Sequence, residues 1–152
     1  MTGVPRRTRA AADRPGMRAR RLALMALFEA EFRASTAVEA LERLARERGA
    51  SAAVHAHAEQ IVAGVLAERP ALDAEIARLA PAIPVAELGN VERAILRSAL
   101  WEVLYSAATP VGETIHDAVS LAKIYAGDAA RRLVNGVLGS VSRSAGAGDR
   151  TA

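Results

Sequence analysis

The segment from about Val91 to Ser106, with Asn90 as its cap, forms a wide apolar surface when it is helical, and this width constrains the fold more than any other feature. This surface includes Ile95, Leu96, Ala99, Leu100, Val103 and Leu104. A surface helix needs one apolar stripe, whereas a helix that is apolar on several sides must be covered on several sides. The sequence therefore predicts a central helix around which other helices pack.

Local signals divide the rest of the chain into helices and give no convincing strand. Aromatic residues make up only 3% of the 152 residues, and alanine, leucine and arginine dominate, which favours helices over strands. The expected helix starts are Met17, the Thr36–Glu39 capping box, Ser51, Pro70, Asn90, Thr109-Pro110 and Asp128. We expect Gly49 to end the second helix and Gly136 to let a neighbouring helix approach closely. The pattern predicts an all-α fold of about seven helices.

Prolines and composition indicate how these helices are grouped. Pro81 and Pro84 enforce a linker, which is the best candidate for a seam between two halves. The two ends of the chain lack periodic apolar residues, so we expect them to be mobile. The predicted organisation is a disordered arginine-rich arm (1–16), a helical domain (17–144) with subdomains of about 17–80 and 86–144, and a disordered tail (145–152).

Positive charge is concentrated at the start of the chain. Residues 1–21 hold seven arginines and one acid, whereas the other 131 residues hold 13 basic and 16 acidic side chains. The arginines are Arg6, Arg7, Arg9, Arg14, Arg18, Arg20 and Arg21. A local charge of +6 on a chain that is otherwise negative is typical of an arm that meets a polyanion such as nucleic acid. A solvated tail that aids solubility is the alternative.

Two further groups of residues suggest binding. The turn from Tyr125 to Arg132 combines an aromatic side chain, a helix start, Arg131 and Arg132, and such groups suit stacked bases and phosphates. Arg93 and Arg97 carry like charges one helical turn apart, so we expect each to find an acidic partner inside the protein or across an interface.

Signals for catalysis, metal binding, export and membrane insertion are missing from the sequence. His55 and His57 are two residues apart, which places them on different sides of a helix, and there is no cysteine or glycine-rich phosphate loop. The apolar run after Arg21 is too short for a signal peptide, and no stretch approaches the roughly 18 apolar residues of a membrane span. We expect a cytoplasmic protein with no catalytic residue, metal or cofactor.

Ordered motifs at fixed spacing fill the second half of the chain. They are Asn90-Val-Glu-Arg-Ala-Ile-Leu-Arg97, Ala99-Leu-Trp-Glu102, Thr109-Pro110, Ala118-Val-Ser-Leu-Ala-Lys123 and Leu133-Val-Asn-Gly-Val-Leu138. The first helix adds Arg18-Ala-Arg20 ahead of the run Ala23-Leu-Met-Ala-Leu-Phe28. Together these motifs resemble the NusB family of bacterial transcription antitermination factors. The resemblance extends over roughly 17–144 and is strongest in 90–138.

The resemblance implies two small helical bundles and a non-enzymatic factor that binds single-stranded, boxA-like RNA in ribosomal RNA transcripts. It also implies that the ribosomal protein NusE binds jointly, within an RNA polymerase antitermination complex. The residues expected to contact RNA are Arg7, Arg9, Arg14, Arg18, Arg20, Arg21, Tyr125, Arg131 and Arg132. Glu92 matches an acidic position at the family's NusE interface. The chain departs from the family pattern at Ala129, where a second acid is frequent, and at Leu133, where phenylalanine is usual.

Three other functions remain open on the sequence. One is a standalone helper of ribosome biogenesis that binds ribosomal RNA through the same fold. A second is the targeting domain of a ribosomal RNA methyltransferase, but 152 residues leave no room for a catalytic domain, so we expect a standalone factor. A third is DNA binding, which is disfavoured because the helices near the basic arm are largely apolar and offer no polar face to read bases.

Overall fold

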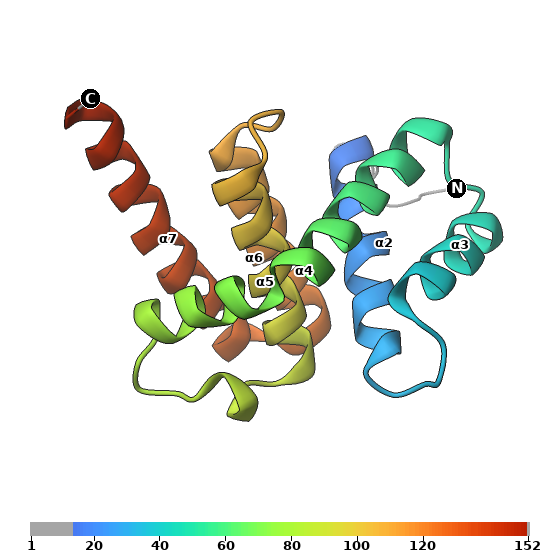
Figure 1. Ribbon diagram of the computed structural model, residues 1–152, viewed down its shortest axis with the longest axis horizontal. Coiled ribbons are helices and arrows are strands. Elements are labelled where there is room, and N and C mark those ends of the chain that lie inside the picture. Colours follow the sequence, from blue (N-terminus) through green and yellow to red (C-terminus); the bar gives the residue numbers. More distant parts are fainter. Residues whose placement is uncertain (1–13, 152) are drawn as a thin grey trace, which may run out of the picture. The chain divides into compact units, whose positions relative to one another are not determined.

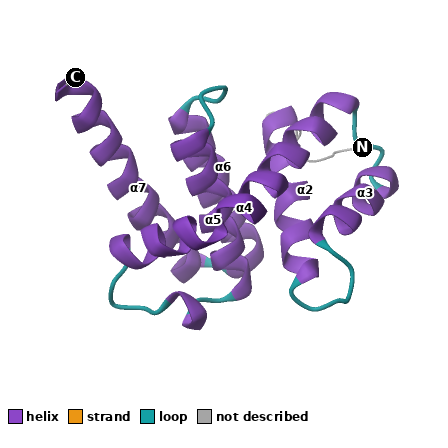
Figure 2. Cartoon of the chain, in the orientation of Figure 1, coloured by secondary structure: helices purple, strands orange, loops and turns teal. Residues whose placement is uncertain are grey.

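The computed structural model describes residues 14–151, with side chains described up to Arg143, and all regular structure in that range is helical (Figure 2). The elements are α2 (Pro15–Ala30), α3 (Ala37–Glu47), α4 (Ala52–Leu79), the 3-10 helix η1 (Val85–Glu87), α5 (Asn90–Tyr105), α6 (Val111–Ala126) and α7 (Asp128–Thr151), shown in Figure 1. The prediction of an all-α fold is confirmed.

Helix α4 is one continuous helix where the sequence suggested two. Pro70 lies inside it, so the prediction that this proline starts a separate helix is wrong. Proline lacks one main-chain donor and crowds the preceding turn, which weakens a helix locally. That cost is offset by burial, because Ile61, Val65, Leu72 and Ile76 follow one face across the proline and are all at most 2% exposed.

The chain forms two compact units, Met1–Val62 and Ala63–Ala152. The division falls inside α4, so this helix contributes its first part to one unit and its second part to the other. The proline pair at 81 and 84, expected to mark a seam, lies within the second unit, in the connection that carries η1.

The first unit packs α2 against α3 around small and branched apolar side chains. Its core residues include Ala19, Leu22, Ala23, Ala26, Leu41, Leu44, Val54 and Ala58. The predicted capping box at the start of α3 is confirmed. The Thr36 amide donates to Glu39 Oε1 (2.9 Å), and the Glu39 amide donates to Thr36 Oγ1 (3.1 Å).

An ion-pair cluster joins α2 to α3 in the first unit. The Arg43 guanidinium contacts both carboxylate oxygens of Glu29 and also donates to Glu47 Oε1 (3.1 Å). The hydrogen bond from Arg43 holds the pKa of the Glu29 carboxyl below its ordinary value. The charged form of Glu29 is therefore favoured in the folded protein.

Helix α5 is the centre of the second unit, as its wide apolar surface predicted. Every residue from Ala94 to Leu100 is buried, and α5 packs against both α6 and α7, which also pack against each other. Burial on several sides explains why apolar residues spread so widely around this helix.

Helix α4 approaches α5 closely at Gly64. A Cβ atom at this position would overlap the Trp101 ring of α5, so the ring occupies the space that any side chain at position 64 needs. By contrast, a Cβ at Gly136 would meet nothing within 4 Å. The expectation that Gly136 permits a close helix approach is wrong, and Gly64 performs that role.

Arg97 finds its acidic partner inside the second unit. Its Nε and Nη2 donate to the two carboxylate oxygens of Asp73 on α4, at 2.7 and 2.9 Å. The Arg97 side chain is only 8% exposed, so this paired geometry compensates for its loss of water. Together with the contact between Gly64 and Trp101, it fixes the part of α4 that belongs to the second unit on α5.

The first prediction concerns the glycine beneath Trp101. We expect Gly64→Ala to lower the free energy of unfolding by about 1–3 kcal/mol, because the added methyl group must displace a packed indole. Gly136→Ala is the matched control: it adds the same group to an open helix position and should stabilise by up to about 1 kcal/mol. Urea denaturation followed by circular dichroism measures both changes. Equal effects of the two substitutions would contradict the packing described for Trp101.

The second prediction concerns the response of the first unit to acid. Because the pKa of Glu29 is lower in the folded than in the unfolded state, its contribution to stability is present above the unfolded-state pKa and is lost as pH falls through the folded-state value. We expect Glu29→Gln to lower the urea midpoint at pH 7, and the difference from the parent protein to shrink as pH falls below the ordinary glutamate pKa of about 4.3. Glu87→Gln, which changes an exposed carboxyl on η1, is the control and should have the same urea midpoint as the parent protein at each pH.

Candidate nucleic-acid interface

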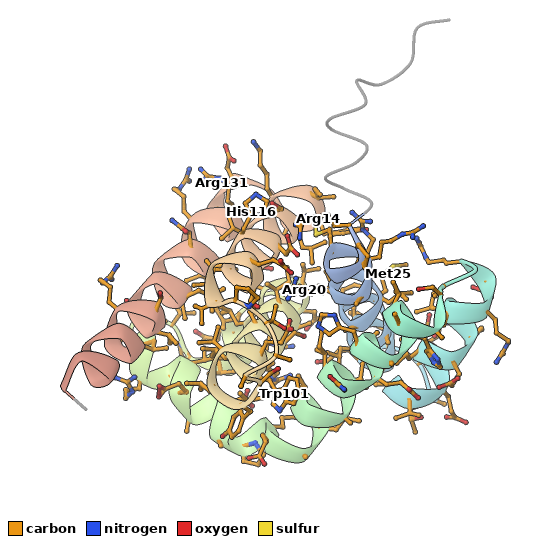
Figure 3. The ribbon with its side chains drawn as sticks, turned by 90° about the horizontal axis from the view of Figure 1, so that it is seen from above. Arg14, Arg20, Met25, Trp101, His116 and Arg131 are labelled. Carbon is orange, nitrogen blue, oxygen red and sulfur yellow. The ribbon has the colours of Figure 1, made fainter. Side chains whose placement is uncertain are left out.

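The first turns of α2 separate its arginines by face. Arg14 precedes the helix, and Arg14, Arg18 and Arg21 follow the spacing of one helical face, on which Arg18 is exposed and the other two are partly exposed. Arg20 lies about 200° around the helix from Arg18 and is only 5% exposed. Figure 3 labels Arg14, just before this helix, and Arg20 within it. From the sequence, all of these arginines were expected to contact RNA, but the helix exposes only some of their side chains to solvent.

The start of α2 is an unfavourable place for cations unless an anion binds there. A helix N-terminus carries partial positive charge and exposes backbone amides, and its first turn here contains no acidic residue and no side-chain cap. Arginine side chains add further positive charge at the same end. The arrangement suits a phosphate-bearing partner.

Arg48 is a cation that the sequence analysis missed. It lies at the end of α3, yet it lines one cavity with Arg18 and Arg21 of α2. Basic residues are common at helix C-termini because they favour the helix dipole there, so nothing in the sequence distinguished Arg48 from its neighbours. The expected contacts Arg7 and Arg9 lie outside the described residues.

The turn between α6 and α7 forms a second exposed surface, in the second unit. Tyr125 is 43% exposed near the end of α6, and Gly127, at φ 94°, reverses the chain in a conformation that favours glycine. Arg132 is exposed, whereas Arg131 donates to Asp128 Oδ1 at 3.2 Å. Arg131, labelled in Figure 3, thereby holds the pKa of the Asp128 carboxyl below its usual range. Asp128 is the first residue of α7 and precedes the exposed Ala129.

Glu92 lies on the first turn of α5, beside a loop that Arg93 organises. Arg93 Nη1 donates to the backbone oxygens of Leu88 (2.8 Å) and Val85 (3.3 Å). The Glu92 carboxylate folds over Gly89, where a Cβ would overlap it. The half-buried Glu92 therefore lies on a well-supported surface, in a position suited to a cationic partner group.

One group in the described part of the chain has ligand atoms close enough to hold a metal ion. Glu42, His55 and Glu59 place one such atom each within 4.8 Å of one another. His55 Nε2 lies 3.1 Å from Glu42 Oε1 and 3.9 Å from Glu59 Oε2, so these side chains already pair with each other across α3 and α4. We assign them a structural role, because exposed acidic groups of this kind are common without a metal.

None of the helices within residues 14–151 combines the length and the hydrophobicity that crossing a membrane requires.

Comparison with known proteins identifies the family. Residues 17–143 match the model of the NusB family. The chain is 36% identical over 124 residues to the transcription antitermination protein NusB of Heliobacterium modesticaldum, a match that covers 82% of this chain and 60% of the relative. It is 33% identical over 127 residues to the NusB of Dehalococcoides mccartyi, covering 84% of this chain and 89% of that protein.

A solved structure of similar fold contains RNA. It is described as antitermination factors NusB and NusE in complex with dsRNA, and it superposes with a TM-score of 0.78 at 25% identity. The match covers 87% of this chain and 98% of the other. The likeness extends through both units of the described structure. The helical fold, the ordered motifs of the second half and the matched family model together show that this chain belongs to the NusB family.

Proposed function

We propose that this chain is a transcription antitermination factor that binds the boxA element of ribosomal RNA transcripts together with ribosomal protein NusE. The complex would act on RNA polymerase in the cytoplasm. The observation that carries the proposal is the arginine face at the start of α2, in a chain whose relatives are transcription antitermination proteins. A related NusB is known in a complex with NusE and dsRNA, which supports both partners.

The proposed RNA contacts are of two kinds, contacts to phosphates and stacking on bases. Arg14, Arg18 and Arg21 offer guanidinium groups that pair with phosphate oxygens, and such contacts orient a nucleic acid without reading its sequence. Tyr125 offers an exposed ring on which an unpaired base can stack, with Arg132 nearby in the sequence for a phosphate. Base stacking requires unpaired nucleotides, so we favour single-stranded RNA.

Glu92 is the proposed contact for NusE. Its carboxylate is available on the first turn of α5, and a basic side chain of the partner would form a charge-assisted hydrogen bond with it. Such a contact would raise the affinity for NusE and, through joint binding, the affinity for RNA. It would leave the affinity of the chain alone for RNA unchanged.

The third prediction tests RNA and partner together. We expect the protein to bind single-stranded boxA RNA more tightly than a scrambled strand or the boxA duplex, and to bind tighter still with NusE. The logarithm of affinity should fall with the logarithm of salt concentration, by about 0.7 for each phosphate contact on a single strand. Fluorescence anisotropy with labelled RNA measures this slope. An RNA affinity that does not change with salt concentration would contradict the proposed phosphate contacts.

The same assay tests the contact with NusE. Glu92→Gln should reduce only the increase in RNA affinity that NusE causes.

The fourth prediction separates the arginines of α2. Arg18→Ala with Arg21→Ala should weaken RNA binding several-fold and leave the thermal midpoint nearly unchanged, because exposed side chains contribute little to folding. Arg20→Ala should instead destabilise the fold, on the order of 3 kcal/mol, because Arg20 is buried and has interaction partners within the protein. Thermal denaturation and anisotropy on the same samples distinguish the two effects. Loss of stability in the double variant would mean that the exposed arginines are structural.

A further inference from the structure

A cavity of about 200 Å³ lies in the first unit, between the start of α2 and the turn that joins α3 to α4. Arg18, Arg21 and Arg48 line it together with Leu22, Ala50 and Val54. Leu22 and Val54 are each only 3% exposed, so they form an apolar floor, and the guanidinium-bearing side chains supply its polar edge. No acidic residue lines this cavity.

A rigid turn holds Arg48 at the cavity. Gly49 has a φ of 63°, and the Ala50 amide donates to the Ala45 oxygen (2.9 Å). The Gly49 amide donates to the Arg46 oxygen (3.2 Å), which completes the Schellman pattern of a helix end. Ser51 Oγ then accepts from the Val54 amide (3.2 Å) and caps α4. Little freedom remains in the backbone that carries Arg48.

The three arginines of the cavity are not neutralised within the described part of the chain. Arg43, Arg78, Arg97 and Arg131 each form an ion pair with a carboxylate there. The side chains of Arg18, Arg21 and Arg48 form no ion pair or hydrogen bond with any residue from 14 to 143. Like charges gathered around one cavity repel each other. A bound anion would attract each of them and so offset this repulsion.

The size of the cavity limits what it can hold. Pockets for drug-sized ligands measure roughly 300–1,000 Å³, so about 200 Å³ suits a smaller group. A phosphate with its attached sugar matches this space, with oxygens toward the guanidinium groups and ribose carbons against Leu22 and Val54. Arginine suits such a site because its planar fork can bind two phosphate oxygens at once.

We propose that this cavity binds one phosphodiester unit of the RNA backbone, and that Arg48 is a phosphate ligand together with Arg18 and Arg21. The proposal rests on the proposed function, because the phosphate belongs to the RNA that the chain binds. It extends the proposed RNA surface from α2 onto the α3–α4 turn, which no sequence pattern indicated.

The fifth prediction uses Arg48→Gln, with Arg46→Gln as its matched control. Both variants remove one positive charge from the last residues of α3, but only Arg48 lines the cavity. For Arg48→Gln we expect a five- to tenfold loss of RNA affinity and a salt slope that is smaller by about 0.7. Arg46→Gln should stay within twofold of the parent protein. The thermal midpoints of both variants should match.

Small competitors identify the anion. Uridine monophosphate at millimolar concentration should displace labelled RNA partially from the parent protein and less from Arg48→Gln, and inorganic phosphate should compete more weakly because it lacks the sugar. If inorganic phosphate displaced RNA as well as uridine monophosphate does, the apolar floor would have no role in binding.

Two results would overturn the proposal that this cavity binds a phosphodiester while leaving the proposed function intact. In one, Arg48→Gln and Arg46→Gln reduce RNA affinity equally, which indicates a general charge effect. In the other, Arg48→Gln binds RNA normally while Arg18→Ala with Arg21→Ala does not. If the parent protein fails to bind RNA with or without NusE, the proposed function fails first, and the cavity proposal fails with it.

Discussion

The structure depends above all on the apolar face of α4. Ile61 and Val62 are buried near the end of the first unit, and Val65, Leu72 and Ile76 are buried in the second, so one helix supplies core residues to both. Each fully buried side chain of this size contributes on the order of 2 kcal/mol. Several of them outweigh the local cost of Pro70, which is why the helix continues through a residue that ordinarily ends one.

Close contact and charge pairing then specify how α4 meets α5 in the second unit. The missing side chain at Gly64 admits the Trp101 ring, and Asp73 pairs with the nearly buried Arg97. Neither contact tolerates a shift along the helix, since a shift by one turn would place a side chain under the indole and separate the ion pair. Apolar burial therefore supplies the stability of this pairing, and these two contacts define its register.

Among the residues that the structure describes, two sets of arginines differ in whether their side chains pair with a carboxylate. Arg43, Arg78 and Arg97 each bind a carboxylate within their own unit. Arg18, Arg21 and Arg48 surround a cavity without such partners among the described residues. Several cations left unpaired around one cavity suit an anion from outside, and this is the physical basis for the proposal that RNA binds the first unit.

Sequence reasoning succeeded where the interactions are local. The capping box at Thr36, the helix end at Gly49 and the wide apolar surface of α5 all depend on residues within a few positions of each other, and the structure contains them as predicted. It failed at Pro70 and Gly136, because the outcome there depended on burial and on neighbours from other helices.

For the candidate site, the sequence by itself determined that positive charge gathers before and within α2, because charge is a property of composition. Only the tertiary structure decided which of those charges can reach a ligand. Packing buries Arg20, leaves Arg18 exposed, and brings Arg48 beside it from the end of another helix. The physical reason is that a side chain's face and neighbours are set by how helices pack, and packing joins residues that are distant in the sequence.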